Sequence, residues 1–205
     1  MTQETPMPEL DPEVLSEARD RARELIRCGF QEPDEIAGSL AELLDDQGLT
    51  EEEAELIVAP LWEERLAEQA GWPEVTDVDR LGAAFDALEG EGVVAAMDFT
   101  CCASCGYAEI GDEADEDSRG FVFFHQQDTE RAAAGQGLML RYGGFRAAGG
   151  PDGEGSVDAA ALRTVGIGRE VVAALTAEGL SVEWDGSPDR AILVAPLEWL
   201  NRLPE

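Results

Sequence analysis

The spacing of apolar residues along the chain changes near Gly90. Before this point, apolar residues recur at helical spacing in segments that open with helix-capping pairs, such as Thr50 with Glu53 and Thr76 with Asp79. After it, short runs rich in β-branched and aromatic residues alternate with further helical segments. The change predicts an α+β (α/β-like) fold: a helical N-terminal region followed by a mixed β-sheet of about five strands with packed helices.

Four helices are expected before Gly90: one between Asp11 and Gly29, one over 33–47, one opened by Thr50 and one opened by Thr76. Leu43 is expected to face inward from the second helix. Pro60 lies within the third helix, where it predicts a kink or two short helices that meet there, because proline removes a helical hydrogen-bond donor.

Beyond Gly90, strands are predicted at 93–97, 121–124, 138–142, 180–184 and 191–194, with helices over 128–134 and 156–178. The strand at 93–97 is expected to be buried, and the helix at 156–178 to be interrupted at Gly166-Ile-Gly168. A glycine-rich loop is expected over 143–155. The chain therefore divides into a flexible tail (1–10), a helical subdomain (11–90) and an α/β domain (91–205), although the last two could form one continuous domain.

The chain carries a formal net charge of −31, from 45 acidic residues against 14 basic ones, all of them arginine. Such a charge repels nucleic acids and anionic membranes, so we expect neither as a partner and consider a basic protein partner instead. The acids are spread along the chain, which favours well-solvated surfaces over mimicry of a nucleic acid. No apolar run reaches the roughly 18 residues of a membrane helix, and the first residues lack the features of a secretory signal. We therefore predict a cytoplasmic protein with reduced cysteines; the oligomeric state is left open.

The most specific chemical feature is the cluster Cys101-Cys102-Ala-Ser-Cys105. The spacing of Cys102 and Cys105 lets two thiolates occupy adjacent corners of a tetrahedral zinc site. Cys101 offers a third ligand, and His125, at the end of a predicted strand, offers a fourth. The sequence thus predicts a structural zinc bound by Cys101, Cys102, Cys105 and His125. Zinc sites usually show two such cysteine pairs and this chain has one, so reduced thiols packed at a strand end explain the cluster equally well.

The alternative is a redox or hydrolytic enzyme that uses Cys102, Cys105 and His125. Two features argue against redox chemistry. The acidic residues at 109–117 are expected to raise the thiol pKa values, and Gly106 is expected to prevent a helix directly after the cysteines.

Asp128, Glu130 and Arg131 follow His125 and form a candidate polar pocket for acid–base chemistry. A lone histidine is more often a hydrogen-bonded structural residue. We therefore favour a non-enzymatic interaction protein whose acidic helical face contacts a partner.

Three stretches of the sequence resemble a known family: Trp72-Pro-Glu-Val-Thr-Asp-Val-Asp-Arg-Leu81, the stretch from Arg119 to Arg131, and Gly168-Arg-Glu-Val-Val172 followed by 182–188. The family is an uncharacterised bacterial one, common in actinobacteria and known as domain of unknown function 6891. The resemblance covers most of the chain from about residue 11 onward. It implies a bacterial cytoplasmic protein and brings no activity, cofactor or catalytic residue with it.

Overall fold

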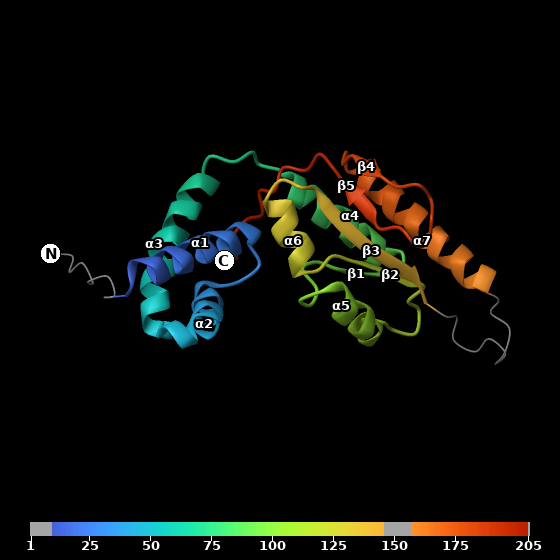
Figure 1. Cartoon of the computed structure of the whole chain (residues 1–205). Helices are drawn as coiled ribbons and strands as arrows, with labels where there is room; N and C mark the ends of the chain where they lie inside the picture. The colour runs from blue at the N-terminus through green and yellow to red at the C-terminus, as the bar shows by residue number, and fades with distance from the viewer. Residues whose placement is uncertain (1–9, 146–156, 205) are drawn as a thin grey trace. The chain divides into compact units, whose positions relative to one another are not determined.

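The structure is a computed structural model that describes residues 10–145 and 157–204. The contacts divide the described residues into two units (Figure 1). The helical unit contains the residues up to Glu74 and those from Leu200 onward, and the sheet unit spans Val75–Trp199. The division falls earlier than the predicted boundary at residue 90, because the fourth helix packs with the sheet. The predicted tail lies outside the described residues, apart from Leu10.

The helical unit is built from α1 (Pro12–Cys28), α2 (Pro33–Leu43), the short 3-10 helix η1 (Asp45–Gln47) and α3 (Glu51–Gln69). As predicted, Asp11 caps α1 by accepting a hydrogen bond from the main-chain N–H of Glu13, and Gly29 ends the helix in the left-handed region. The end of the chain returns to this unit, where the Asn201 amide donates to the main-chain oxygens of Cys28 and Gly29.

Two predictions for the helical unit are wrong. Leu43, expected to be buried, is 57% exposed, because the inward row of α2 continues through Leu40 to Leu44. The predicted division of the third helix into two short helices is wrong, since α3 runs as one helix through Pro60, and the alternative of a kink stays a prediction.

The sheet unit contains α4 (Asp77–Gly90), β1 (Val93–Ala96), α5 (Ala103–Glu109), η2 (Ile110–Glu113), β2 (Gly120–Phe123), α6 (Gln126–Ala133), β3 (Leu138–Gly144), α7 (Val157–Ala177), β4 (Val182–Glu183) and β5 (Ile192–Val194). The strand order is β1-β2-β3-β5-β4. β1 and β2 are parallel and the other pairs are antiparallel. The described residues thus form seven α-helices and a five-stranded mixed sheet, which confirms the predicted α+β fold.

Helices cover both faces of this sheet (Figure 1). α4 and α7 pack on one face, where Gly120 of β2 leaves room for Ile167 of α7. α5 and α6 pack on the other, where Phe123 of β2 fills the space beside Gly106. Because β1 stands at one end of the strand order, one of its sides pairs with β2 and the other is an edge of the sheet.

Several details of the sheet unit differ from the prediction. Only Val93 of β1 is fully buried, since the strand lies at the edge. α7 continues without interruption through Gly166 and Gly168. α6 begins at Gln126, earlier than predicted, because His125 caps it. Of the predicted glycine-rich loop, Gly143 and Gly144 belong to β3, and residues 146–155 lie outside the described part.

Candidate metal and thiol site

Cys101 and Cys102 end a tight connection between β1 and α5, and Cys105 lies in the first turn of α5. Asp98 and Thr100 adopt positive φ angles of 50° and 60°, a conformation that a β-branched residue such as threonine rarely adopts. The main-chain N–H of Phe99 donates to the oxygen of Phe124, and that of Gln126 donates to the oxygen of Thr100. These hydrogen bonds join the connection to the end of β2, so the sheet holds in place the backbone that leads to the cysteines.

The sulfurs of this connection form one group. The Sγ atom of Cys105 lies 3.7 Å from that of Cys101 and 3.7 Å from that of Cys102. All three sulfurs lie within 4.8 Å of one another. Cys101 is exposed, whereas Cys102 and Cys105 are half-buried, so the group is open to solvent on the Cys101 side. At a separation of 3.7 Å, Cys105 is joined to neither Cys101 nor Cys102 by a disulfide bond, which is about 2.05 Å long.

The two thiols of the CxxC segment have opposite pKa shifts. Interaction with the main-chain N–H of Cys105 lowers the pKa of Cys102 below its ordinary value, and the neighbouring thiols add to this effect. The adjacent sulfurs of Cys101 and Cys102 raise the pKa of Cys105 to about 11. The expectation that the acidic residues at 109–117 raise the thiol pKa values is therefore wrong for Cys102, because local hydrogen bonds dominate.

Gly106 has a different role from the one expected. It lies inside α5, which begins directly after Cys102, so it does not prevent a helix. A Cβ atom at this position would lie 2.4 Å from Cε2 of the buried Phe123 ring. Glycine is required here because the helix approaches the sheet closely, and this approach places the cysteines against β2.

His125 does not share the group of sulfurs. Among the described residues, the ligand atoms that gather within 4.8 Å belong to the three cysteines alone. The His125 side chain is buried and caps α6, with Nδ1 accepting a hydrogen bond from the main-chain N–H of Asp128 at 3.3 Å. Its Nε2 lies 3.0 Å from Oδ2 of Asp128, a favourable electrostatic contact without good hydrogen-bond alignment. Burial lowers the pKa of His125, which keeps the imidazole neutral at pH 7.

A second polar cluster surrounds this histidine. Nη2 of Arg141 lies 3.3 Å from Oδ1 of the buried Asp128. The hydroxyl of Thr129 donates to the carboxylate of Asp98 at 2.5 Å, and the main-chain oxygen of His125 lies 3.3 Å from the same hydroxyl. Burial raises the pKa values of Asp128 and Asp98. The cluster joins the ends of β1 and β2 to α6 and β3, so it stabilises the strand ends that carry the cysteines.

The predicted polar pocket is only partly assembled. Asp128 is buried at the cluster, Glu130 is half-buried and Arg131 is exposed. The sequence analysis did not identify Arg141, Asp98 and Thr129 as members of the polar cluster around His125. An arginine within the apolar run Leu138-Met-Leu-Arg-Tyr142 was the available signal, because a charged residue in a buried strand requires a partner.

The profile of the family described as "Domain of unknown function (DUF6891)" matches residues 11–203 of the chain. The chain belongs to this family. The match confirms the resemblance carried by the three stretches described above. Comparisons with curated proteins and with solved structures found no match. Within residues 10–145 and 157–204, no helix of this family member is long and apolar enough to span a membrane.

Proposed function

We propose that the chain binds a thiophilic metal ion, Zn²⁺ in the first instance, through Cys101, Cys102 and Cys105. The distances from Cys105 to the other two sulfurs carry this proposal. Three thiolates at zinc–sulfur distances of about 2.3 Å on a tetrahedron lie about 3.8 Å apart. The two separations of 3.7 Å agree with this value, and the sulfurs of Cys101 and Cys102 lie within 4.8 Å of each other.

The proposed site has three protein ligands among the described residues. The described residues supply three ligand atoms to the group, and Cys101 is exposed. Closed structural zinc sites use four protein ligands, whereas sites with three keep a position for water or another molecule. The arrangement therefore supports a site that exchanges metal or accepts an external ligand, and it supports the predicted structural site with His125 as fourth ligand less well.

Acidic surroundings are compatible with this use. Three acidic residues, Glu109, Asp112 and Glu113, follow the cysteines in α5 and η2. Negative charges near a bound cation favour its binding, because they partly offset the loss of its hydration. The same negative charges do not stabilise a free thiolate, because a thiolate is itself an anion.

The experiment is a Zn²⁺ titration of reduced protein against a chromophoric chelator, with Co²⁺ as a spectroscopic substitute. We expect one metal per chain in the wild type, and at least about tenfold weaker binding in Cys102→Ser and Cys105→Ser. Cys28→Ser is the matched control, because it removes a thiol that is buried in α1 of the helical unit. Binding that is substoichiometric, or unchanged in the Cys102 and Cys105 variants, would show that the cluster is not a metal site.

A second candidate function is dithiol–disulfide exchange, and the separation of 3.7 Å between the Cys102 and Cys105 sulfurs favours it. In this reaction the Cys102 thiolate attacks a substrate disulfide and expels one thiolate, which forms a mixed disulfide. Cys105, as its thiolate, then attacks the Cys102 sulfur and expels the second thiolate. The chain ends with a Cys102–Cys105 disulfide, and the substrate disulfide is reduced by two electrons to two thiols.

Trapping distinguishes the two functions. A Cys105→Ser variant of an exchange catalyst accumulates the mixed disulfide with a model disulfide such as oxidised glutathione, whereas Cys102→Ser does not. A metal site without redox activity gives no accumulation that depends on Cys102, and its thiols are protected from the disulfide by Zn²⁺.

A further inference from the structure

The free edge of β1 lies beside a cavity that is separate from the cysteine group. The cavity has a volume of about 670 Å³ and is lined by all four residues of the strand, Val93–Ala96. Its remaining walls come from the end of α4 and Gly92 after it, from Phe99, from Glu113 at the end of η2 and from residues between η2 and β2. The cavity therefore runs along a sheet edge and lies wholly within the sheet unit.

Main-chain hydrogen-bonding groups of β1 face this cavity. The oxygen of Ala96 accepts a hydrogen bond from the N–H of Phe124, which places Ala96 among the residues whose main chain faces β2. In a parallel ladder the alternate residues turn their N–H and C=O groups to the other side. The main-chain groups of Val93 and Ala95 therefore point to the open edge.

The edge lacks the features that usually prevent pairing with another strand. β1 reads Val-Val-Ala-Ala, with no proline and no charged residue. Its register with β2 is continuous from Val93 to Ala96, so no bulge twists the edge away. Exposed edges without such protection are templates for strand addition.

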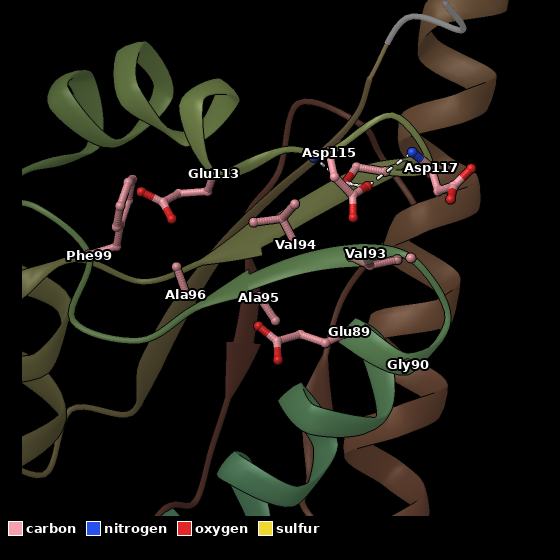
Figure 2. Close-up of a pocket in the computed structure, with 12 residues that line it drawn as sticks. Glu89, Gly90, Val93, Val94, Ala95, Ala96, Phe99, Glu113, Asp115 and Asp117 are labelled. Carbon is pink, nitrogen blue, oxygen red and sulfur yellow. Dashed lines mark hydrogen bonds between the residues drawn. The ribbon is translucent and has the colours of Figure 1, made fainter.

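The ionisable side chains along the cavity are all acidic. They are Glu89, Glu113, Asp115 and Asp117, and among the described residues no basic side chain lines the cavity. Figure 2 shows Glu89 on one side of β1 and the other three acids on the opposite side. Asp115 is held in place by hydrogen bonds that its carboxylate accepts from the Ser118 hydroxyl and from the main-chain N–H of Asp117. The arginine nearest in sequence to these acids, Arg119, forms an ion pair with Glu170, in which Nη2 lies 2.7 Å from Oε2.

We propose that the free edge of β1 is a docking site for an extended segment of another protein rich in lysine and arginine. The segment adds a sixth strand to the sheet, and its main chain pairs with Val93 and Ala95. Side chains of an added strand point alternately to the two faces of the sheet. Basic residues on both faces of the segment therefore meet Glu89 on one side and Glu113, Asp115 and Asp117 on the other.

Charge decides between this occupant and a second copy of the chain. Pairing of β1 with β1 of another copy would bring two identical sets of four acids together, in molecules that each carry a net charge of −31. Like charges at close range oppose association, whereas a basic segment is attracted to the edge. The proposal is independent of the metal site, because none of the cysteines lines the cavity.

The test is fluorescence anisotropy of the full chain with a labelled peptide of about eight residues, in which pairs of lysines alternate with pairs of valine or threonine, so that lysine lies on both faces of an added strand. Two matched peptides accompany it. One carries N-methyl groups on alternate main-chain nitrogens, which block strand pairing, and the other has glutamate in place of lysine. We expect binding of the first peptide, at least about tenfold weaker binding of the methylated one, and no binding of the acidic one.

Protein variants make the assignment specific. Ala95→Pro removes a main-chain donor at the open edge, a position at which strands tolerate proline. The triple variant Glu89→Gln, Glu113→Gln, Asp117→Asn removes charge with little change of shape. Each is expected to weaken peptide binding at least about tenfold. The control Glu42→Gln with Asp45→Asn removes charge from an acidic cavity of the helical unit that has no strand, and should leave binding unchanged.

Three outcomes would overturn the proposal. The first is no binding of the basic peptide by the wild type. The second is equal binding of the plain and methylated peptides, or equal binding by wild type and Ala95→Pro, which would show unspecific attraction between charges. The third is a dimer in sedimentation that Ala95→Pro dissociates, which would assign the edge to a second copy of this chain.

Discussion

At the scale of single residues, Gly106 shows how packing sets the geometry of the cysteine cluster. A Cβ atom at this position would lie within 2.4 Å of the Phe123 ring, whose side chain is fully buried between α5 and the sheet. Neither the ring nor the helix can move without disturbing its neighbours. The absence of a side chain at residue 106 is thus what lets Cys102 and Cys105 approach β2.

We predict that Gly106→Ala destabilises the sheet unit by about 1–3 kcal/mol, the usual cost of overpacking a filled site. Urea unfolding followed by circular dichroism measures this change. Gly111→Ala is the matched control, because nothing lies within 4 Å of a Cβ atom there, and its stability should stay within about 0.5 kcal/mol of the wild type. A Gly106→Ala protein as stable as the wild type would contradict the tight packing of α5 on Phe123.

The pKa shifts of Cys102 and Cys105 lead to a second prediction at this scale. Because the pKa of Cys102 is lowered and that of Cys105 is raised to about 11, the metal-free chain carries more thiolate on Cys102 near pH 8. Iodoacetamide should therefore modify Cys102 before Cys105, as measured by peptide mass spectrometry at short reaction times. Equal labelling, or labelling of Cys105 first, would show that the main-chain N–H of Cys105 does not stabilise the Cys102 thiolate.

At the scale of elements, α7 illustrates two uses of glycine in one helix. A Cβ atom at Gly168 would lie 2.8 Å from both the Trp184 and the Tyr142 rings, whereas nothing lies within 4 Å of one at Gly166. Tyr142 and Trp184 are themselves joined by a hydrogen bond from the indole N–H to the phenol oxygen. Of these two glycines, only Gly168 therefore lies against the rings of Tyr142 in β3 and of Trp184, which directly follows β4.

We predict opposite effects of alanine at these two positions. Gly168→Ala should lower the free energy of unfolding by about 1–3 kcal/mol through overpacking. Gly166→Ala should raise it by about 0.5–1 kcal/mol, because alanine is the better helix former and the site has room. Thermal unfolding of both variants beside the wild type tests the pair, and a stabilising Gly168→Ala would contradict the contact with Trp184.

Comparison of the elements with their predictions shows what local patterns contain. The capping pairs Thr50–Glu53 and Thr76–Asp79 gave correct helix starts, because caps are formed by residues close in sequence. The predicted interruption at Gly166 and Gly168 and the predicted division at Pro60 are wrong, because these helices are stabilised by contacts that a local pattern does not contain. The edge position of β1 and the pairing of Asp128 with Arg141 depend on strand order, which a single sequence does not specify. The cysteine spacing identified the sulfur group, whereas the burial of His125 away from it required the fold.

The buried cluster around His125 couples stability to pH. Burial lowers the pKa of His125 from 6.5, with Arg141 acting in the same direction and Asp128 against it. Between 6.5 and the lower folded value, the unfolded chain binds the proton more readily than the folded one. The contribution of this histidine to stability is therefore complete above pH 6.5 and is lost as the pH falls below it. The raised pKa values of Asp98 and Asp128 act in the opposite direction, since their protonation favours the folded state.

We predict that His125→Asn, which keeps a side-chain acceptor for the N–H of Asp128, loses less stability than the wild type between about pH 7.5 and pH 5.5. Urea unfolding at a series of pH values measures the two slopes. Asp98 and Asp128 are present in both proteins, so the difference between the slopes reports His125. A steeper slope in the variant would mean that the histidine is charged in the folded state.

At the scale of the whole molecule, the net charge of −31 opposes the compact state. Ion pairs offset little of this repulsion: the described pairs at Arg21 and Arg23 are exposed contacts within one helix, and such pairs contribute at most about 0.5 kcal/mol each.

Salt screens repulsion between exposed charges, since the Debye length falls from about 14 Å at 50 mM to about 4 Å at 500 mM. We therefore predict that raising NaCl over this range increases Tm by about 3–6 °C at pH 7.5. The control is the same series near pH 5, closer to the sequence isoelectric point of 4.1, where protonated carboxyls leave less repulsion to screen and the gain should shrink by about half. An equal gain at both pH values would show that general salting-out of apolar surface causes the effect. Repulsion between acidic side chains would then not destabilise the folded chain, and a basic partner would not stabilise it by neutralising them.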